Sequence, residues 1–326
     1  MRHDFVLDDA NAVPVAEICR RLDGLPLAIE LAASWTRLLT PAALLQRLDT
    51  RLLELGGPHD VPARHQTIRA TIAWSHDLLS PEERALFARL GVFTGGCTIE
   101  AAEAVSGPER AGALDGLAAL ADQSLIFQVA SDGAPRFAML ETVREFALER
   151  LEEHGPGEAR EAHAAFYLML AEEAEPHLRG PDQHAWLDRL TLEHPNLRGA
   201  LACFREQGNQ TCALRLAGAL GRFWEARGHI AEGRGILDDL LDAAANDSRI
   251  APGVRARALS WAGILAWVQS DFEAARQRHG DALARYEEAE DERGVAFSLN
   301  CLATQIAGQG DIDEAERILA DALRRY

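Results

Sequence analysis

The sequence predicts a mainly α-helical chain: a helical domain, then a winged helix with one small β-hairpin, then an α-solenoid of helix-hairpin repeats. Three observations predict this order. Aromatic residues make up only 6% of the chain against 48% hydrophobic residues, which favours Ala- and Leu-rich helices over sheets. Apolar residues recur at helical spacing almost throughout, and only residues 124–139 have a β-prone pattern. In the last third, one block of residues recurs 40 positions later, from 271 to 311.

The charge balance excludes several classes of partner. The chain has 33 basic and 51 acidic residues and a formal net charge of −18, and no basic residue is a lysine. This charge disfavours contact with phosphate backbones and anionic membranes. No apolar run reaches the roughly 18 residues of a spanning helix, and no signal peptide is present, so we expect a cytoplasmic protein without membrane contact. The five cysteines form no CxxC pair and are expected to be core residues: Cys19, Cys97, Cys203, Cys212 and Cys301.

The first predicted domain, residues 1–60, consists of short helices. Apolar residues between 15 and 22 lie on one face of a first helix, which Gly24 ends. Pro26 stands early in a second helix, and Thr40 caps a third.

The second predicted domain, residues 61–154, has the order of a winged helix. Ser80, followed by Pro81 and by Glu83 three positions on, is a strong helix start. Three or four helices precede a single hairpin, a pattern typical of winged helices. The predicted elements are helices at 65–79, after Ser80, 98–105, about 109–121 and about 141–153, strands at 124–129 and 136–139, and a turn at Ser131-Asp132-Gly133.

The third predicted domain, residues 155–326, is all helix, arranged in pairs. Asp271 to Ala275 matches Asp311 to Ala315, and an earlier copy covers Gly228 to Leu241. Because a tetratricopeptide repeat has roughly 34 residues, these longer copies are tetratricopeptide-like. Small residues mark the predicted helix crossings: Gly263, Ala275 and Ala315. Such units must stack to bury their faces.

Several stretches together resemble the STAND signal-transduction ATPases of the NB-ARC group, in the bacterial branch found in SARP- and LuxR-type transcriptional regulators. They occur in the order of that family. The stretches are CRRLDGLPLAIELAA (Cys19 to Ala33), RHQTIRATIAWSHDLLSPEERALFARLGVFTGGCTIEAAEAV (Arg64 to Val105), RFAMLETVREFALERL (Arg136 to Leu151), EHPNLRGAL (Glu193 to Leu201) and RFWEARGHIAEGRGIL (Arg222 to Leu237).

The resemblance implies a P-loop ATPase core, then a helical domain with the GLPL motif, a winged helix and a sensor array. This chain begins just before GLPL and stops directly after a repeat, so we expect the natural protein to continue. Walker A and Walker B are missing, and Gly228 to Gly233, followed by Arg234, is a repeat turn rather than a P-loop. We therefore expect no enzyme activity from this chain alone. ADP or ATP would bind together with a P-loop domain, which would be its own or a separate partner.

The resemblance also assigns roles to two short segments. In relatives the GLPL proline packs against the adenine side of the nucleotide, which maps to Gly24, Leu25, Pro26 and Leu27. The alternative is a helix end followed by a proline-started helix, and both are compatible. Many relatives have Met-His-Asp after the hairpin, where the histidine contacts the phosphate of ADP. Here the residues are Met139, Leu140 and Glu141, and leucine cannot donate a hydrogen bond. Another group or packing would then hold the off state.

Other candidates are weaker. Ser75, His76 and Asp77 are neighbours on one helix and cannot form a catalytic triad. No metal site is predicted, because the histidines at 163, 177, 184 and 194 lack ligand spacing. Trp224 and Trp267 are candidates for a partner groove, although tryptophans also fill gaps between stacked helices.

The sequence thus predicts a regulatory segment that closes over nucleotide and senses a protein or small-molecule signal through its repeats. One alternative is a tetratricopeptide-repeat scaffold for protein interactions. Another is a winged-helix DNA-binding regulator. The predicted recognition region, 98–120, argues against the latter, because its charged residues are four acids and one arginine: Glu100, Glu103, Glu109, Asp115 and Arg110.

Overall fold

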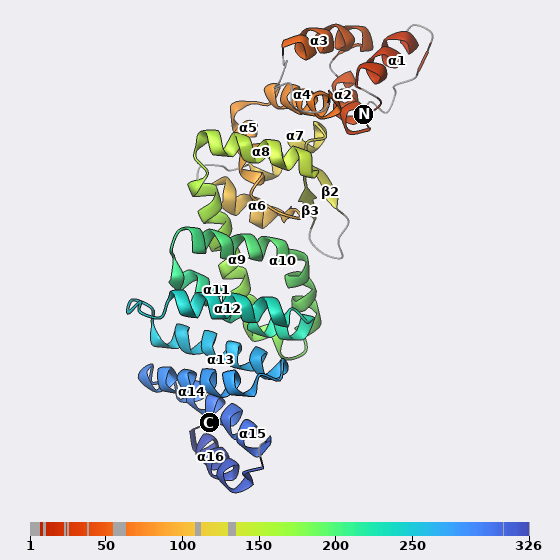
Figure 1. The fold of residues 1–326 in the computed structure, drawn as a ribbon. Coiled ribbons are helices and arrows are strands. Elements are labelled where there is room, and N and C mark those ends of the chain that lie inside the picture. Colours follow the sequence, from red (N-terminus) through yellow and green to blue (C-terminus); the bar gives the residue numbers. More distant parts are fainter. Residues whose placement is uncertain are drawn as a thin grey trace. The chain divides into compact units, whose positions relative to one another are not determined.

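The computed structural model describes two compact units, residues 1–163 and 164–326, and each is treated by itself (Figure 1). The fold is mainly helical, with sixteen α-helices and one small sheet among the described residues, as the sequence predicts. The described residues are 7–8, 11–22, 24, 26–37, 39–54, 63–107, 112–129, 135–308 and 310–325.

The first unit begins with four helices around a tryptophan pair. They are α1 (Ala12–Arg21), α2 (Pro26–Ser34) with the 3-10 turn η1 (Trp35–Arg37), α3 (Pro41–Glu54) and α4 (Ala63–Asp77). Trp35 and Trp74 meet with ring centroids 5.4 Å apart, and both are buried. Apolar residues of α1, α2 and α3 pack around them: Ile18, Leu22, Ala28, Ala32 and Leu44. The second predicted helix ends at Ser34, and the chain continues as the 3-10 turn η1 from Trp35.

The winged helix follows in the predicted order. Ser80 and Glu83 form the predicted capping box at the start of α5. His76 packs against Phe87 of α5 and Phe146 of α8, with ring centroids 5.6 Å apart in both pairs. The elements are α5 (Pro81–Leu90), β1 (Cys97–Thr98), α6 (Ile99–Ser106), α7 (Ala113–Asp122), β2 (Phe127–Val129), β3 (Arg136–Ala138) and α8 (Glu141–His154).

The sheet has one strand more than the predicted hairpin. Its order is β1-β3-β2, both pairs are antiparallel, and Phe137 lies opposite Cys97 on one side and Gln128 on the other. Strand β1 has two residues, too few to show an alternating pattern. Gly96 brings it into place with a φ of +87°, and a Cβ there would lie 2.5 Å from the carbonyl oxygen of Phe137.

One strand boundary also differs from expectation. The second strand begins at Phe127 rather than at Ser124, because Ser124 ends the preceding helix with a φ of +57°. The described part of α7 begins at Ala113. The start expected near 109 and the turn at 131–133 both lie outside the described residues.

The second unit is a series of antiparallel helix pairs in a repeat-like arrangement. Among the described residues, no helix is long and apolar enough to cross a membrane. The elements are α9 (Gly157–Ala174), the 3-10 turn η2 (Glu175–Leu178), α10 (Gln183–Glu206), α11 (Gln210–Arg227), α12 (Ile230–Ala243), α13 (Pro252–Val268), α14 (Phe272–Glu288), α15 (Glu292–Gly308) and α16 (Ile312–Arg325).

The predicted 40-residue spacing has a direct structural counterpart. Asp271 caps α14 by accepting from the N–H of Ala274, and Asp311 accepts from the N–H of Glu314 in the same way. Asn209 caps α11 with an equivalent bond to Cys212. In α11, α14 and α16 a short polar side chain thus satisfies a free N–H at the start of the helix.

Adjacent helices of this unit approach closely because an aromatic ring of one covers a glycine of the next. A Cβ added at Gly233 would lie 2.6 Å from the ring of Trp224. The same holds for the other pairs at 2.1 to 2.8 Å: Gly221 with Trp261, Gly263 with His279 and Gly294 with Tyr286. Since real Cβ atoms do not approach so closely, only glycine fits at these four positions.

We expect Gly233→Ala to lower the free energy of unfolding by about 1–3 kcal/mol, because the methyl group must displace the Trp224 ring. Gly235→Ala, two positions along α12, is the matched control. It meets nothing within 4 Å and should raise stability by about 0.5–1 kcal/mol through helix propensity. Urea unfolding followed by circular dichroism measures both. Equal effects of the two substitutions would contradict the packing described.

The burial of His279 leads to a prediction about how the free energy of unfolding depends on pH. Burial against Gly263 lowers the pKa of His279 to about 4 from its ordinary 6.5. As the pH falls, His279 of the unfolded chain therefore binds a proton at a higher pH than His279 of the folded protein. The contribution of neutral His279 to the free energy of unfolding is complete above pH 6.5 and is lost as the pH falls toward 4. The loss from this group is about 3 kcal/mol. His279→Leu should flatten the curve of unfolding free energy against pH by that amount; parallel curves for the two proteins would refute it.

Candidate functional site

The GLPL turn lies at the surface of the first unit. Gly24 is exposed, has a φ of +66° and has no other group within 4 Å of where its Cβ would be. Pro26 is also exposed and begins α2. Leu25 lies outside the described residues, and Leu27 is described only as part of α2. The Gly-ended helix and the proline-started helix that the sequence predicts are therefore both present.

The predicted switch position lies where the sheet meets α8. Leu140 is the N-cap residue of α8 and is 43% exposed, and it makes no side-chain cap bond. Glu141 pairs with Arg144, and this guanidinium holds the pKa of the Glu141 carboxyl below its usual value. Arg144 also donates to the carbonyl oxygen of Gly91 at 3.3 Å, which links α8 to the end of α5.

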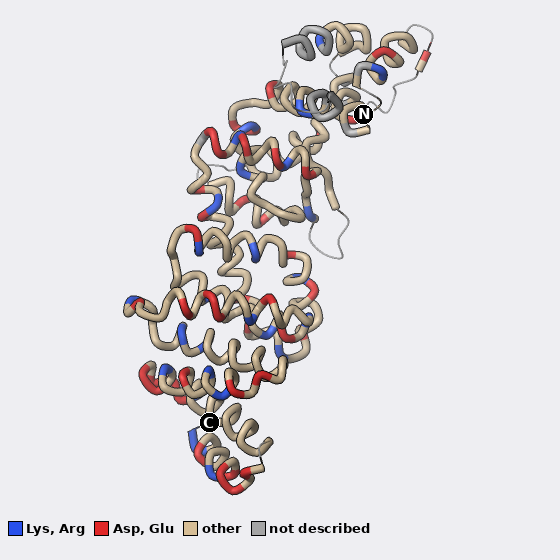
Figure 2. Tube along the Cα trace, in the orientation of Figure 1, with Lys and Arg blue, Asp and Glu red and all other residues tan. Residues whose placement is uncertain are grey.

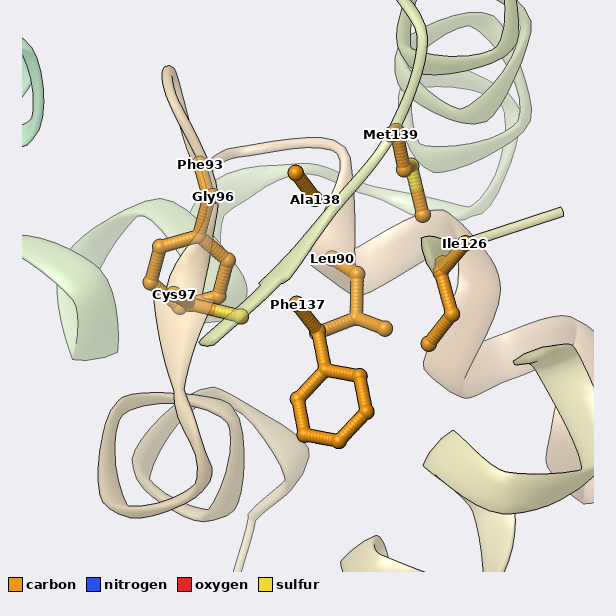
Figure 3. A pocket seen from close by; sticks show the side chains of 8 residues that line it. All are labelled: Leu90, Phe93, Gly96, Cys97, Ile126, Phe137, Ala138 and Met139. Carbon is orange, nitrogen blue, oxygen red and sulfur yellow. The ribbon is translucent and has the colours of Figure 1, made fainter. Parts of the chain in front are cut away.

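Met139 lines a small apolar hollow between the sheet and α5 (Figure 3). The lining residues are Leu90, Phe93, Gly96, Cys97, Ile126, Phe137, Ala138 and Met139. The hollow has room for about one water molecule. It cannot hold a nucleotide, and Met139 lines it together with residues of α5 and of the sheet.

The two candidate groove tryptophans have different environments. Trp224 is 1% exposed and packs on Gly233, so it does not line an open groove and instead fills a gap between α11 and α12. Trp267 is half-buried, and Phe272 meets it edge to face with centroids 4.8 Å apart. Phe272 is 46% exposed and Val268 is 48% exposed, so an apolar surface surrounds Trp267.

Ser75, His76 and Asp77 do not form a catalytic group. Ser75 is fully buried and accepts a hydrogen bond from the indole of Trp35 at 3.5 Å. Burial lowers the pKa of His76, which packs between aromatic rings. These residues therefore join α4 to its neighbours.

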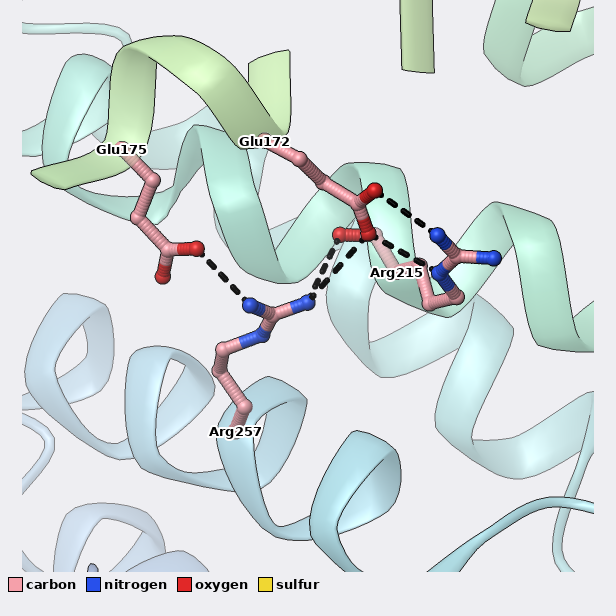
Figure 4. Close-up of polar contacts among 4 residues, drawn as sticks. All are labelled: Glu172, Glu175, Arg215 and Arg257. Atoms are coloured by element: carbon pink, nitrogen blue, oxygen red, sulfur yellow. Dashed lines mark hydrogen bonds and ion pairs between the residues drawn. The ribbon is translucent and has the colours of Figure 1, made fainter. Parts of the chain in front are cut away.

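A charged network joins four elements of the second unit (Figure 4). Arg215 of α11 binds both carboxylate oxygens of Glu172 of α9, at 2.8 and 2.7 Å. Arg257 of α13 donates to Glu175 of η2 at 2.7 Å and lies 3.9 Å from Glu172. Burial raises the pKa of Glu175, and Arg257 opposes this shift. Since every group has an opposite charge beside it, the network stabilises helix packing and offers no free reactive group.

A second polar cluster could hold a metal ion. One ligand atom each from His194, His229 and Glu232 lies within 4.8 Å of the other two. The sequence pattern did not point to this cluster, because His194 and His229 are far apart in sequence and lie at different helices. A pairing of the EHPNL and RGHIAEG segments was the only signal that could have found it.

Two helices of the winged helix, α6 and α7, carry the wrong charge for DNA. In the described parts of α6 and α7 every charged residue is acidic: Glu100, Glu103, Asp115 and Asp122. Figure 2 shows acidic and basic residues mixed along the described helices. Neither helix thus offers the arginines that phosphate contacts require.

The comparisons with known proteins agree with the winged helix. The model of a winged helix-turn-helix domain matches residues 79–152. A Mycobacterium tuberculosis protein named "Putative HTH-type transcriptional regulator" is 40% identical over 263 residues, which are 78% of this chain and 30% of that protein. An uncharacterized Mycobacterium bovis protein is 42% identical over 164 residues, which are 49% of this chain and 42% of that protein. The chain thus spans under a third of the length of the curated regulators it matches.

Two solved structures are more distant. BtubC from P. vanneervenii has a TM-score of 0.43 and 18% identity over 76% of this chain and 91% of that chain. A STAND protein with a tetratricopeptide repeat sensor from Pyrococcus horikoshii has a TM-score of 0.29 and 12% identity over 92% of this chain and 60% of that chain. Both scores lie below 0.5 and carry no argument about function.

We expect the chain to bind duplex DNA no more tightly than a Kd of about 100 μM at physiological salt, because α6 and α7 repel phosphates. Fluorescence anisotropy of a labelled duplex measures this affinity. The titration is repeated at salt concentrations from about 50 to about 200 mM, the range over which phosphate contacts change affinity strongly. The expected slope of log K against log salt is near zero. A steep negative slope would show phosphate contacts and favour the DNA-binding alternative.

Proposed function

We propose that this chain is the regulatory segment of a STAND-type signal-transduction ATPase that acts in transcriptional regulation. Its GLPL helices and winged helix would close over ADP or ATP held by a P-loop domain. The observation that carries the proposal is the exposed Gly24 and Pro26, in the helical part of the chain that precedes a matched winged helix. The similarity to proteins named as regulators supports the transcriptional setting.

The turn has the physical properties that the role needs. Gly24 presents bare backbone, with nothing within 4 Å of its Cβ position, so a ligand can approach closely. Pro26 offers a rigid apolar face and has no N–H of its own to satisfy. A purine ring packs favourably on such a surface.

The winged helix would close the site without the usual histidine. Leu140 stands at the start of α8 with 43% of its surface exposed, where a histidine would point in the relatives. It offers an apolar contact to a neighbouring domain in place of a hydrogen bond to phosphate. Holding ADP in the closed state would then rest on packing and on groups of the P-loop domain.

The helix pairs of the second unit would receive the signal. A protein or small molecule that binds one of two arrangements better shifts the equilibrium between them, and this is the requirement for regulatory coupling. Tetratricopeptide-like repeats suit the role because stacked hairpins present an extended surface. On this proposal the chain itself catalyses nothing and acts in the cytoplasm.

A scaffold for protein interactions is the second candidate. The exposed apolar side chains of Val268 and Phe272 beside Trp267 favour it, because surface aromatics anchor partners. This candidate predicts that residues 155–326 alone capture the partner and that nucleotide has no influence on capture. The regulatory proposal predicts that nucleotide changes the affinity for the partner.

In the full-length protein with its P-loop domain, Pro26→Asp should weaken ADP binding about tenfold or more, because a carboxylate replaces an apolar contact and repels phosphate. Aspartate is favourable at a helix start, so α2 should still form. Pro181→Asp, at an exposed proline of the second unit, is the control and should leave ADP affinity unchanged. Calorimetric titration with ADP measures both. Unchanged affinity in Pro26→Asp would remove GLPL from the nucleotide pocket.

A further inference from the structure

We propose that His194, His229 and Glu232 form a binding site for a divalent transition-metal ion, with Zn²⁺ as the ion of best fit. The site lies wholly within the second unit and does not depend on the proposed function. It would add a metal-dependent link between α10 and α12.

The three side chains converge from two helices that are separate in sequence. His194 lies in the middle of α10, His229 is the N-cap residue of α12, and Glu232 stands in the first turn of α12. The Nε2 atom of His194 is 3.1 Å from one oxygen of Glu232, and the Nδ1 atom of His229 is 3.9 Å from the other. One ligand atom of each residue lies within 4.8 Å of the other two. Zinc ligands about 2.0–2.2 Å from the ion require donors about 3.3 Å apart, so only small side-chain movements are needed.

The apolar ring of Phe223 forms the base of the site, and the outer side of the site is open to solvent. The fully buried ring of Phe223 lies under both imidazoles, with centroids 5.3 Å from His194 and 5.6 Å from His229. The side chains of His194, Glu232 and His229 are 11%, 20% and 34% exposed. An ion can therefore enter from solvent, while the base of the site fixes both rings.

The donor set selects the class of ion. Two imidazoles and one carboxylate are the ligands of open zinc sites, where a water completes four-coordination. Imidazole nitrogens suit Zn²⁺, Ni²⁺ and Cu²⁺, whereas Mg²⁺ and Ca²⁺ prefer oxygen ligands. The cluster contains no thiol, so zinc here would stay exchangeable.

Arg198 opposes the ion and sets the affinity. Its Nε atom donates to Glu232 at 2.6 Å, and its Nη2 atom pairs with the second carboxylate oxygen. This guanidinium and the positive end of α12 both repel a cation. Arg198 is 58% exposed on a long side chain, so it can swing into solvent when an ion binds. Binding also displaces the contact between His194 and Glu232, and any proton on Nε2 must pass to Nδ1 or to water.

The structural alternative is that Arg198, His194 and Glu232 only hold α10 against α12. The two readings differ in the effect of removing Arg198. A purely structural triad loses a stabilising pair and gains no affinity for zinc. A metal site masked by Arg198 gains affinity when the guanidinium is absent.

The test is calorimetric titration of the chelator-treated full chain with ZnCl₂, with MgCl₂ in parallel. We expect saturable zinc binding and none with magnesium. His194→Ala and His229→Ala should each weaken zinc binding about tenfold or more, whereas Arg198→Ala should strengthen it about tenfold. His184→Ala, at an exposed histidine elsewhere in the second unit, should leave it unchanged.

Three results would overturn the proposal: no zinc binding, zinc binding unchanged in both histidine variants, or zinc affinity unchanged or lowered in Arg198→Ala. Unchanged binding in the histidine variants would place the zinc elsewhere on the chain. Circular dichroism checks that each variant folds. Glu232→Gln, which keeps the shape of the side chain, should weaken zinc binding even if a histidine variant fails to fold.

Discussion

The second unit depends on aromatic rings that lie on glycines of adjacent helices. Four such pairs follow one another along the repeats: Trp224 on Gly233, Trp261 on Gly221, His279 on Gly263 and Tyr286 on Gly294. Each glycine lets a flat ring lie directly on helix backbone, which brings the two helices closer than any larger residue would allow. The repeat-like arrangement follows, because a helix pair with such a face cannot bury it without its neighbour.

The polar groups of this unit are arranged by the same close packing. With α11 against α12 and α13, Arg215 and Arg257 reach the acidic residues Glu172 and Glu175 at the end of α9. The cluster around Glu232 arises where α12 begins beside α10.

Local signals in the sequence were sufficient where a few neighbouring residues determine the structure. The capping box at Ser80, the glycine turn at Gly24 and the repeated caps at Asp271 and Asp311 all require only short-range hydrogen bonds. The roles expected for GLPL and for position 140 come from the resemblance alone and stay predictions. What the sequence could not predict depends on contacts distant along the chain.

Three features show that limit. Strand β1 exists only because β3 pairs with it, and its two residues carry no pattern of their own. Trp224 and Trp267 both lie near the end of an apolar helix. Trp224 is nevertheless a buried core residue, because its ring packs on Gly233. The cluster of His194, His229 and Glu232 joins α10 and α12, and the sequence contains no pattern that predicts that these two helices lie side by side.

A double-mutant cycle on Gly221 and Trp261 tests most directly whether the ring-on-glycine contact governs the packing. The account predicts that Gly221→Ala destabilises the native protein, because a Cβ would lie 2.1 Å from the Trp261 ring. In the Trp261→Ala background the same change should become neutral or stabilising, for a coupling of about 1–3 kcal/mol. Additive free energies of unfolding, with no coupling between the two positions, would contradict it.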